Sequence, residues 1–184
     1  VARSGALIGV QEPGKVRGGM RALALADILG VDMEDGSTIC AGKYSFETEK
    51  GHFISRDTQK APAFHNAAKG VYALDENTKV LFSDGEDIIA SARAFLKGRG
   101  VYLNGYTYSF ENTRLLYRAI LWAAGKEELE DCYMTNDPAC ECAFFPSAGK
   151  LIVINSSEED KSVRVSMPGG EKNVSVPAGG VKVV

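Results

Sequence analysis

The sequence predicts an α/β domain followed by a smaller all-β domain, and two observations support this fold class. A glycine turn, a short apolar strand at Val101–Leu103 and a long helix at Phe110–Ala124 follow one another, as in an α/β layer. After this helix no further helical pattern occurs, and short β-forming runs alternate with turn signals. We therefore expect an α/β domain at residues 1–128 and an antiparallel β-sandwich at residues 129–184.

The helix at Phe110–Ala124 has predictable ends and a wide apolar surface. Ser109 can cap its first turn, because the hydroxyl oxygen accepts a hydrogen bond from a free backbone N–H. Gly125 can adopt the left-handed conformation that ends a helix. The polar side is a narrow stripe made of Glu111, Arg114 and Arg118. We expect a helix with so much apolar surface to be covered on more than one side.

A strand and a helix are also predicted near the start of the chain. Residues 5–10 form a small, apolar run that is typical of a strand buried on both faces. After a break at residues 11–14, Met20–Leu29 is typical of a helix, and Gly30 ends it. Strand, loop and helix in this order make half of a βαβ unit.

The loop after this first strand is the first candidate site, because open α/β sheets bind ligands at the carboxyl ends of their strands. The candidate residues are Gln11 and Glu12, with the basic residues Lys15 and Arg17 close behind. The alternative is that residues 12–14 form only a tight turn and that Arg17 is a solvated charge.

The middle of the chain alternates short strands with polar turns. Strands are expected at Ser37–Ser45, His52–Ser55, Gly70–Leu74, Thr78–Phe82 and Ile88–Leu96. Periodicity alone leaves the last of these open between helix and strand, but the glycines at 98 and 100 favour an antiparallel hairpin. These glycines precede a strand and do not open a helix, so a phosphate-binding loop is disfavoured. Residues 59–70 are irregular, and a long loop of this kind usually covers a site or an interface.

Composition excludes several function classes. The net charge of −3 gives no basic surface for nucleic acid or for an anionic membrane. No apolar run approaches the length that crosses a bilayer. The four cysteines, Cys40, Cys132, Cys140 and Cys142, lack the spacing of a zinc site, so reduced cytoplasmic thiols are favoured over a metal site. The chain begins almost at once in an apolar strand, without Met, which suggests a piece of a longer protein.

Seven segments resemble one enzyme family in the same order along the chain. They are Gly9-Val10-x-Glu12-Pro13, residues 25–32, Lys43-Tyr44, His52-Phe53-Ile54, residues 98–105, residues 108–116 and Ile154-Asn155. Together they resemble the C-terminal part of the 1,3-β-galactosyl-N-acetylhexosamine phosphorylases, which include lacto-N-biose phosphorylase and the related galactosyl-rhamnose phosphorylases. The resemblance covers nearly the whole chain.

The resemblance implies a three-part enzyme. An upstream (β/α) barrel would carry the active site. Residues 1–128 would form a class I glutamine amidotransferase-like (flavodoxin-like) domain, also similar to a β-galactosidase trimerisation domain, and residues 129–184 the β-sandwich. The implied reaction is phosphorolysis, in which phosphate attacks the anomeric carbon of galactose and a carboxylic acid of the barrel protonates the departing oxygen. We therefore expect no catalytic residue, metal or cofactor in this chain, and no activity from the chain alone.

The residues agree that a nucleophile of the amidotransferase kind is missing. Such a nucleophile is a cysteine at a strand-to-helix elbow with a histidine beside it. Cys40 lies in an irregular region, and Asn104-Gly105 occupies the end of the strongest strand.

Two functions remain open at this point. In the first, the chain is a non-catalytic portion of a cytoplasmic galactoside phosphorylase that closes over the barrel and supports a homodimer. Its partners would be the barrel, phosphate and the galactoside, and Gln11 and Glu12 would contact substrate. In the second, the chain is an autonomous binding or interaction module without sugar chemistry.

Overall fold

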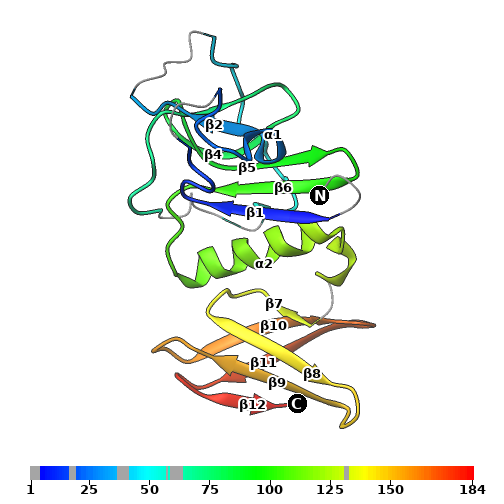
Figure 1. Ribbon diagram of the computed structural model, residues 1–184. Helices are drawn as coiled ribbons and strands as arrows, with labels where there is room; N and C mark the ends of the chain where they lie inside the picture. The colour runs from blue at the N-terminus through cyan, green and yellow to red at the C-terminus, as the bar shows by residue number, and fades with distance from the viewer. Residues whose placement is uncertain (1–4, 17–19, 37–41, 57, 59–63, 131–132) are drawn as a thin grey trace. The chain divides into compact units, whose positions relative to one another are not determined.

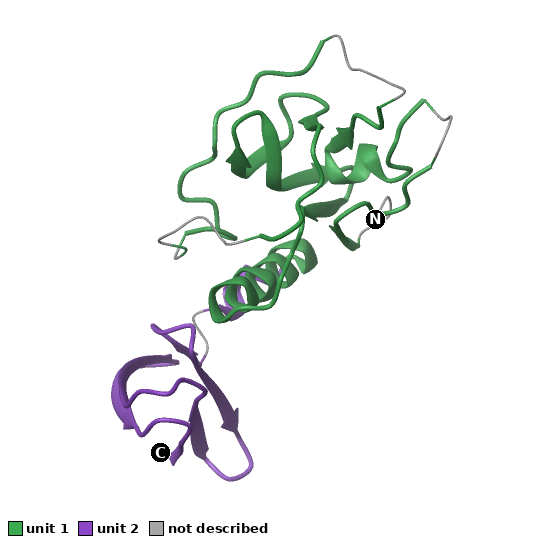
Figure 2. Ribbon diagram, turned by 90° about the vertical axis from the view of Figure 1, so that its left-hand side faces the viewer, with its two compact units in different colours: residues 1–125 green, residues 126–184 purple. Residues whose placement is uncertain are grey.

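The computed structural model describes residues 5–16, 20–36, 42–56, 58, 64–130 and 133–184. The chain divides into two compact units, Val1–Gly125 and Lys126–Val184, which Figure 2 shows in different colours. Within the described ranges, no helix has both the length and the apolar character needed to span a bilayer.

A four-stranded sheet forms the centre of the first unit, in the order β1-β6-β5-β4 (Figure 1). Its strands are β1 (Ala6–Val10), β4 (Lys79–Asp84), β5 (Asp87–Phe95) and β6 (Gly98–Leu103). Strands β4, β5 and β6 pair antiparallel, because turns as short as Gly85-Glu86 and Leu96-Lys97 cannot return a chain in parallel. Only β1 and β6 pair parallel in this sheet.

One face of this sheet is covered by short elements. Helix α1 (Ala26–Leu29) and the antiparallel pair of β2 (Val31–Met33) and β3 (Val71–Ala73) pack there. Their apolar side chains form one buried cluster with the sheet, which includes Leu23, Leu29, Val31, Val71, Ile88 and Tyr102.

The opposite face of the sheet is covered by helix α2 (Phe110–Ala124), which packs along β1 and β6 (Figure 1). The second cluster lies between them and includes Leu81, Ala92, Val101, Leu103, Leu115 and Ala119. Both predicted helix ends are confirmed. The Ser109 hydroxyl accepts from the backbone N–H of Asn112 (3.1 Å), and Gly125 has φ of 67°.

The expected polar stripe of α2 is wrong at one position. Arg118 is 4% exposed, whereas Ile120 is 48% exposed. The Arg118 guanidinium donates to the carbonyl oxygen of Phe53 (3.1 Å) and lies 5.8 Å from the centroid of the Phe53 ring. The segment around Phe53 therefore covers a flank of the helix that its sequence marks as polar.

The predicted α/β, flavodoxin-like fold is wrong, because the chain is mostly β. A flavodoxin-like fold needs a parallel sheet with helices on both faces, but this sheet has one parallel pair. The predicted helix at Met20–Leu29 is reduced to the four residues of α1. Residues 20–25 form turns instead, where Lys15 bridges to Leu23 and the Leu23 N–H donates to the buried Asp32 carboxylate (2.9 Å).

The other strand predictions of this unit have mixed outcomes. The strand and hairpin predicted at residues 88–103 are confirmed as β5 and β6. Residues 42–45 and 52–55 form no strand, so the predictions at Ser37–Ser45 and His52–Ser55 are wrong there. Residues 37–41 lie outside the described residues.

The second unit contains two three-stranded sheets, in the orders β11-β10-β7 and β12-β9-β8. The elements are η1 (Glu127–Leu129), β7 (Met134–Thr135), β8 (Cys140–Phe145), β9 (Lys150–Asn155), β10 (Lys161–Met167), β11 (Gly170–Val176) and β12 (Val181–Val183). Alternate side chains meet in one core, which includes Cys140, Leu151, Val153, Val163, Val165, Val174 and Val176.

Of the cysteines within the described ranges, Cys140 is a buried thiol, and the Cys142 sulfur donates to the Tyr133 carbonyl. Burial is the main cause that raises the pKa of the Cys140 thiol above its ordinary value. Cys40 and Cys132 lie outside the described residues. Across the described part of the chain, no cluster of three or more His, Cys, Asp or Glu side chains is arranged to hold a metal ion.

Candidate functional site

The predicted loop lies where β1 and β6 end together, because parallel strands bring their carboxyl ends to one edge. Gln11 continues the ladder by donating its N–H to the Leu103 carbonyl (3.0 Å). Its own carbonyl accepts from the Tyr102 hydroxyl (2.8 Å), and its side-chain amide donates to the Asn66 carbonyl (2.8 Å). Gln11 has φ of 64°, a conformation that is uncommon outside glycine. These contacts hold the loop in one position.

Glu12 and Lys15 form the exposed part of this loop. Their carboxylate and ammonium groups are 2.6 Å apart, with side chains 38% and 34% exposed. Burial raises the pKa of the Tyr102 hydroxyl, and the Glu12 charge adds to the effect. Because both side chains are partly exposed, the Lys15 ammonium can donate a hydrogen bond to a ligand at the sheet edge and the Glu12 carboxylate can accept one. Arg17, the other predicted basic residue, lies outside the described residues.

Asn104 is the residue at this edge that the site prediction missed. Its side chain is fully buried and makes three hydrogen bonds. The oxygen accepts from the Ala68 N–H (2.8 Å), and the nitrogen donates to the carbonyls of Ala68 (2.8 Å) and Ile88 (3.2 Å). An Asn-Gly pair directly after a buried strand is the signal that could have identified it.

Gly105 allows a close crossing of the chain beside Asn104. Its φ is 69°, and a Cβ atom there would lie 2.7 Å from the carbonyl oxygen of His65. The segment at residues 64–70 therefore runs across the carboxyl ends of β1 and β6. The buried polar groups of the edge bond to this backbone, whereas Glu12 and Lys15 keep partly exposed side chains beside it.

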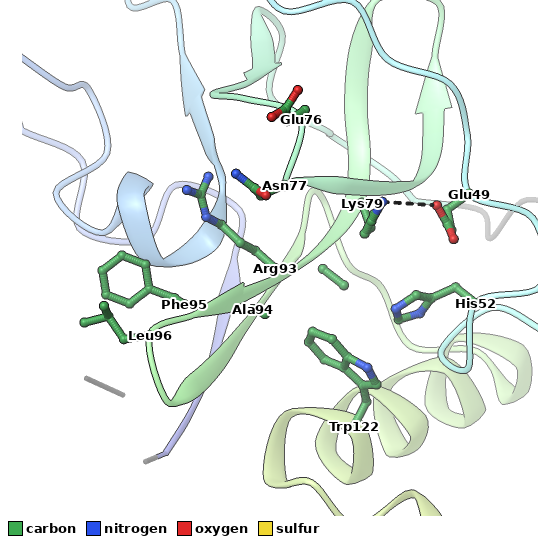
Figure 3. Close-up of a pocket in the computed structure, with 11 residues that line it drawn as sticks. Glu49, His52, Glu76, Asn77, Lys79, Arg93, Ala94, Phe95, Leu96 and Trp122 are labelled. Carbon is green, nitrogen blue, oxygen red and sulfur yellow. Dashed lines mark ion pairs between the residues drawn. The ribbon is translucent and has the colours of Figure 1, made fainter. Parts of the chain in front are cut away.

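A cavity of about 520 Å³ lies beside the carboxyl end of β5 (Figure 3). We call it the edge notch, and its lining residues are Glu49, His52, Glu76, Asn77, Lys79, Ala92, Arg93, Ala94, Phe95, Leu96 and Trp122. Strand β4 begins opposite Ala92, so Arg93–Phe95 pair with β6 alone. The notch collects residues from four separate segments, which is why no single motif predicts it.

The two cationic side chains that line the notch each lie beside a carboxylate. Lys79 lies 3.8 Å from Glu49, and Arg93 donates to the Asp75 carboxylate (2.8 Å). Partial burial acts to raise the Asp75 pKa, but the hydrogen bonds from Asn77 and Arg93 and the Arg93 charge together outweigh it, so the pKa is lowered. Figure 3 shows the His52 and Trp122 rings on the same side of β5. Their centroids are 5.3 Å apart, in an edge-to-face arrangement.

The fold of this chain occurs within one larger enzyme of known structure. The β-galactosidase from Rahnella sp. R3 has a similar fold, with a TM-score of 0.56 and 15% sequence identity. The match covers 100% of this chain and 28% of that enzyme.

The chain belongs to the lacto-N-biose phosphorylase family. The family's central domain matches residues 1–128, and its C-terminal domain matches residues 133–184. The resemblance predicted from the sequence is therefore confirmed.

Two relatives illustrate the relation. A 1,3-beta-galactosyl-N-acetylhexosamine phosphorylase of Lachnoclostridium phytofermentans is 36% identical over 90% of this chain and 22% of its own length. A D-galactosyl-beta-1->4-L-rhamnose phosphorylase of the same organism is 32% identical over 94% of this chain and 23% of its own length. The chain thus spans less than a quarter of each of these relatives.

Proposed function

We propose that this chain is a non-catalytic portion of a phosphorylase that cleaves a β-galactoside with inorganic phosphate. The observation that carries the proposal is the family match, which runs in order through the central and C-terminal domains. The relatives are named for cleaving galactosyl-N-acetylhexosamine or galactosyl-rhamnose linkages. In this proposal the parent protein contains an upstream barrel, which supplies the general acid.

The proposed reaction moves one galactosyl group. Phosphate oxygen forms a bond to the anomeric carbon from the face opposite the leaving sugar, and the glycosidic C–O bond breaks. A carboxylic acid of the barrel gives its proton to the departing oxygen. The products are α-galactose 1-phosphate and the free acceptor sugar.

The role proposed for this chain is to close over the barrel with the loop that carries Gln11 and Glu12. Gln11 would hold the loop in position, because its side-chain amide donates to the Asn66 carbonyl and its own carbonyl accepts from the Tyr102 hydroxyl. Glu12 would contact substrate, since its carboxylate is partly exposed beside Lys15 and can accept a hydrogen bond from a sugar hydroxyl. We also propose a cytoplasmic homodimer, to be tested by light scattering of the full-length protein.

Glu12→Gln in the full-length enzyme tests the contact. The loop should survive this change, because its backbone bond from Lys15 N–H to the Glu12 carbonyl (3.2 Å) does not involve the side chain. We expect kcat/KM for phosphorolysis to fall about 5- to 150-fold, which corresponds to the loss of one charged hydrogen bond worth roughly 1–3 kcal/mol. Glu86→Gln, at an exposed turn residue, is the matched control. A change within about twofold for Glu12→Gln, below roughly 0.5 kcal/mol, would show that the loop is only structural.

The proposal that the upstream barrel catalyses the reaction, and that this chain alone does not, has its own test. Full-length protein and the 184-residue chain are each incubated with phosphate and either galactosyl-N-acetylhexosamine or galactosyl-rhamnose. We expect galactose 1-phosphate from the full-length protein and none from the chain. Release by the chain alone would overturn the non-catalytic role, and no release by the full-length protein would favour the autonomous module.

A further inference from the structure

We propose that the edge notch is a second, separate saccharide-binding site. The proposal concerns binding and does not depend on the phosphorylase activity proposed above. It rests on where the notch lies, on its aromatic wall and on the balance of its charges.

The notch is remote from the loop at Gln11 and Glu12. Strand β6 runs from Gly98, beside the end of β5, to Leu103, beside Gln11. At about 3.3 Å per residue, the length of β6 separates the two places by roughly 17 Å. A sugar in the notch would therefore not be the sugar that Glu12 contacts.

The aromatic wall is held rigid before any ligand binds. The Arg99 guanidinium lies 4.9 Å from the Trp122 ring centroid and also donates to the Trp122 carbonyl (2.6 Å). His52 is fixed as well, because its Nδ1 accepts from the Ile54 N–H (3.2 Å), which places the proton of the neutral ring on Nε2. The Trp122 indole is partly buried, and the part of it that lines the notch offers an apolar surface to the C–H groups of a pyranose at little cost in entropy.

The charges of the notch favour a neutral, hydroxyl-rich ligand over an anion. Lys79 faces the Glu49 carboxylate, and Arg93 is bonded to Asp75. An arriving phosphate or carboxylate would have to compete with these carboxylates for the cations. Hydroxyl groups can instead accept from Lys79 and donate to Glu49 or Glu76 without breaking an ion pair.

Size and the strand edge also fit a saccharide. The volume of about 520 Å³ lies within the roughly 300–1,000 Å³ that small-molecule sites occupy. Leu96, at the turn beside the notch, has a large apolar side chain that is 75% exposed to solvent. Its φ of 53° is a backbone conformation that is uncommon outside glycine. Phe95 and Leu96 line the notch on the side of β5 away from Trp122 (Figure 3).

Trp122 supplies a direct readout, because it is the only tryptophan in the sequence. The chain is titrated with galactose, N-acetylglucosamine and galactosyl-β-1,3-N-acetylglucosamine while the tryptophan emission is recorded. We expect a saturable change with at least one sugar and none with inorganic phosphate. Lys79→Ala and Glu49→Gln should weaken the apparent affinity at least threefold, whereas the control Glu86→Gln should leave it unchanged.

A second measurement covers the case in which the emission is insensitive to ligand. Crystals of the full-length protein are soaked in the disaccharide, and we expect sugar density beside Trp122. Three outcomes overturn the proposal: neither method detecting a sugar, phosphate producing the same response as the sugars, or emission that changes with protein concentration alone. The last result would instead identify a second copy of the chain, added at the strand edge, as the occupant.

Discussion

Replacing Asn104 by Ala is the substitution that most directly tests how the carboxyl edge of the sheet is built. The side chain is fully buried and joins three segments of the first unit through its bonds to Ala68 and Ile88. Alanine removes all three hydrogen bonds. The Ala68 N–H and the carbonyl oxygens of Ala68 and Ile88 then lose this partner. No other amino acid of similar size has both a donor and an acceptor in the required places.

The magnitude follows from the burial of the partners. An unsatisfied buried group costs about 1–3 kcal/mol, and the Ala68 groups are only partly buried. We therefore expect Asn104→Ala to lower the free energy of unfolding by about 2–4 kcal/mol. With a urea m-value of roughly 2 kcal/mol/M, the middle of the usual range for a small protein, the midpoint should fall by about 1–2 M.

Urea unfolding followed by Trp122 emission measures this change, because the only tryptophan lies in the same unit as Asn104. Asn77→Ala is the matched control. Asn77 is exposed, and the bond from its backbone N–H to Asp75 (2.9 Å) survives the substitution. If Asn104→Ala shifts the midpoint no more than Asn77→Ala does, the edge is not held by this side chain and our reasoning is refuted.

Two further predictions concern the same unit. Gly100→Ala should destabilise it by about 1–3 kcal/mol or more, because the new Cβ would lie 2.2 Å from the backbone carbonyl oxygen of Ile28. Gly42→Ala is the control, since a Cβ atom at Gly42 meets no atom within 4 Å. Equal urea midpoints for the two variants would contradict the expectation. Tyr102→Phe should cost about 1 kcal/mol at neutral pH through the lost bond to the Gln11 carbonyl. Because the folded pKa of Tyr102 is raised above 10.0, its stabilisation is present below that pH and lost as the pH rises beyond it. The gap between parent and variant in urea midpoint should therefore narrow between pH 9 and 11, and a constant gap would argue against a buried, protonated Tyr102.

The sequence by itself determined the local elements whose signals lie within a few residues. Ser109 and Gly125 mark the ends of α2, because capping depends on neighbouring backbone groups. The glycines after residue 96 indicated the β5–β6 hairpin for the same reason. The family was also accessible, since ordered segments along the whole chain carry the resemblance.

Only the tertiary structure decided the fold class and the environment of the candidate residues. Residues 20–25 carry apolar side chains at helical spacing, but Leu23 is held in a turn by Asp32, a contact that periodicity does not contain. Arg118 is buried because a segment 65 residues away in sequence supplies the carbonyl of Phe53. Likewise Asn104 and the edge notch depend on which segments the folded chain brings together. Long-range packing and hydrogen bonding overrode local preference at each of these places.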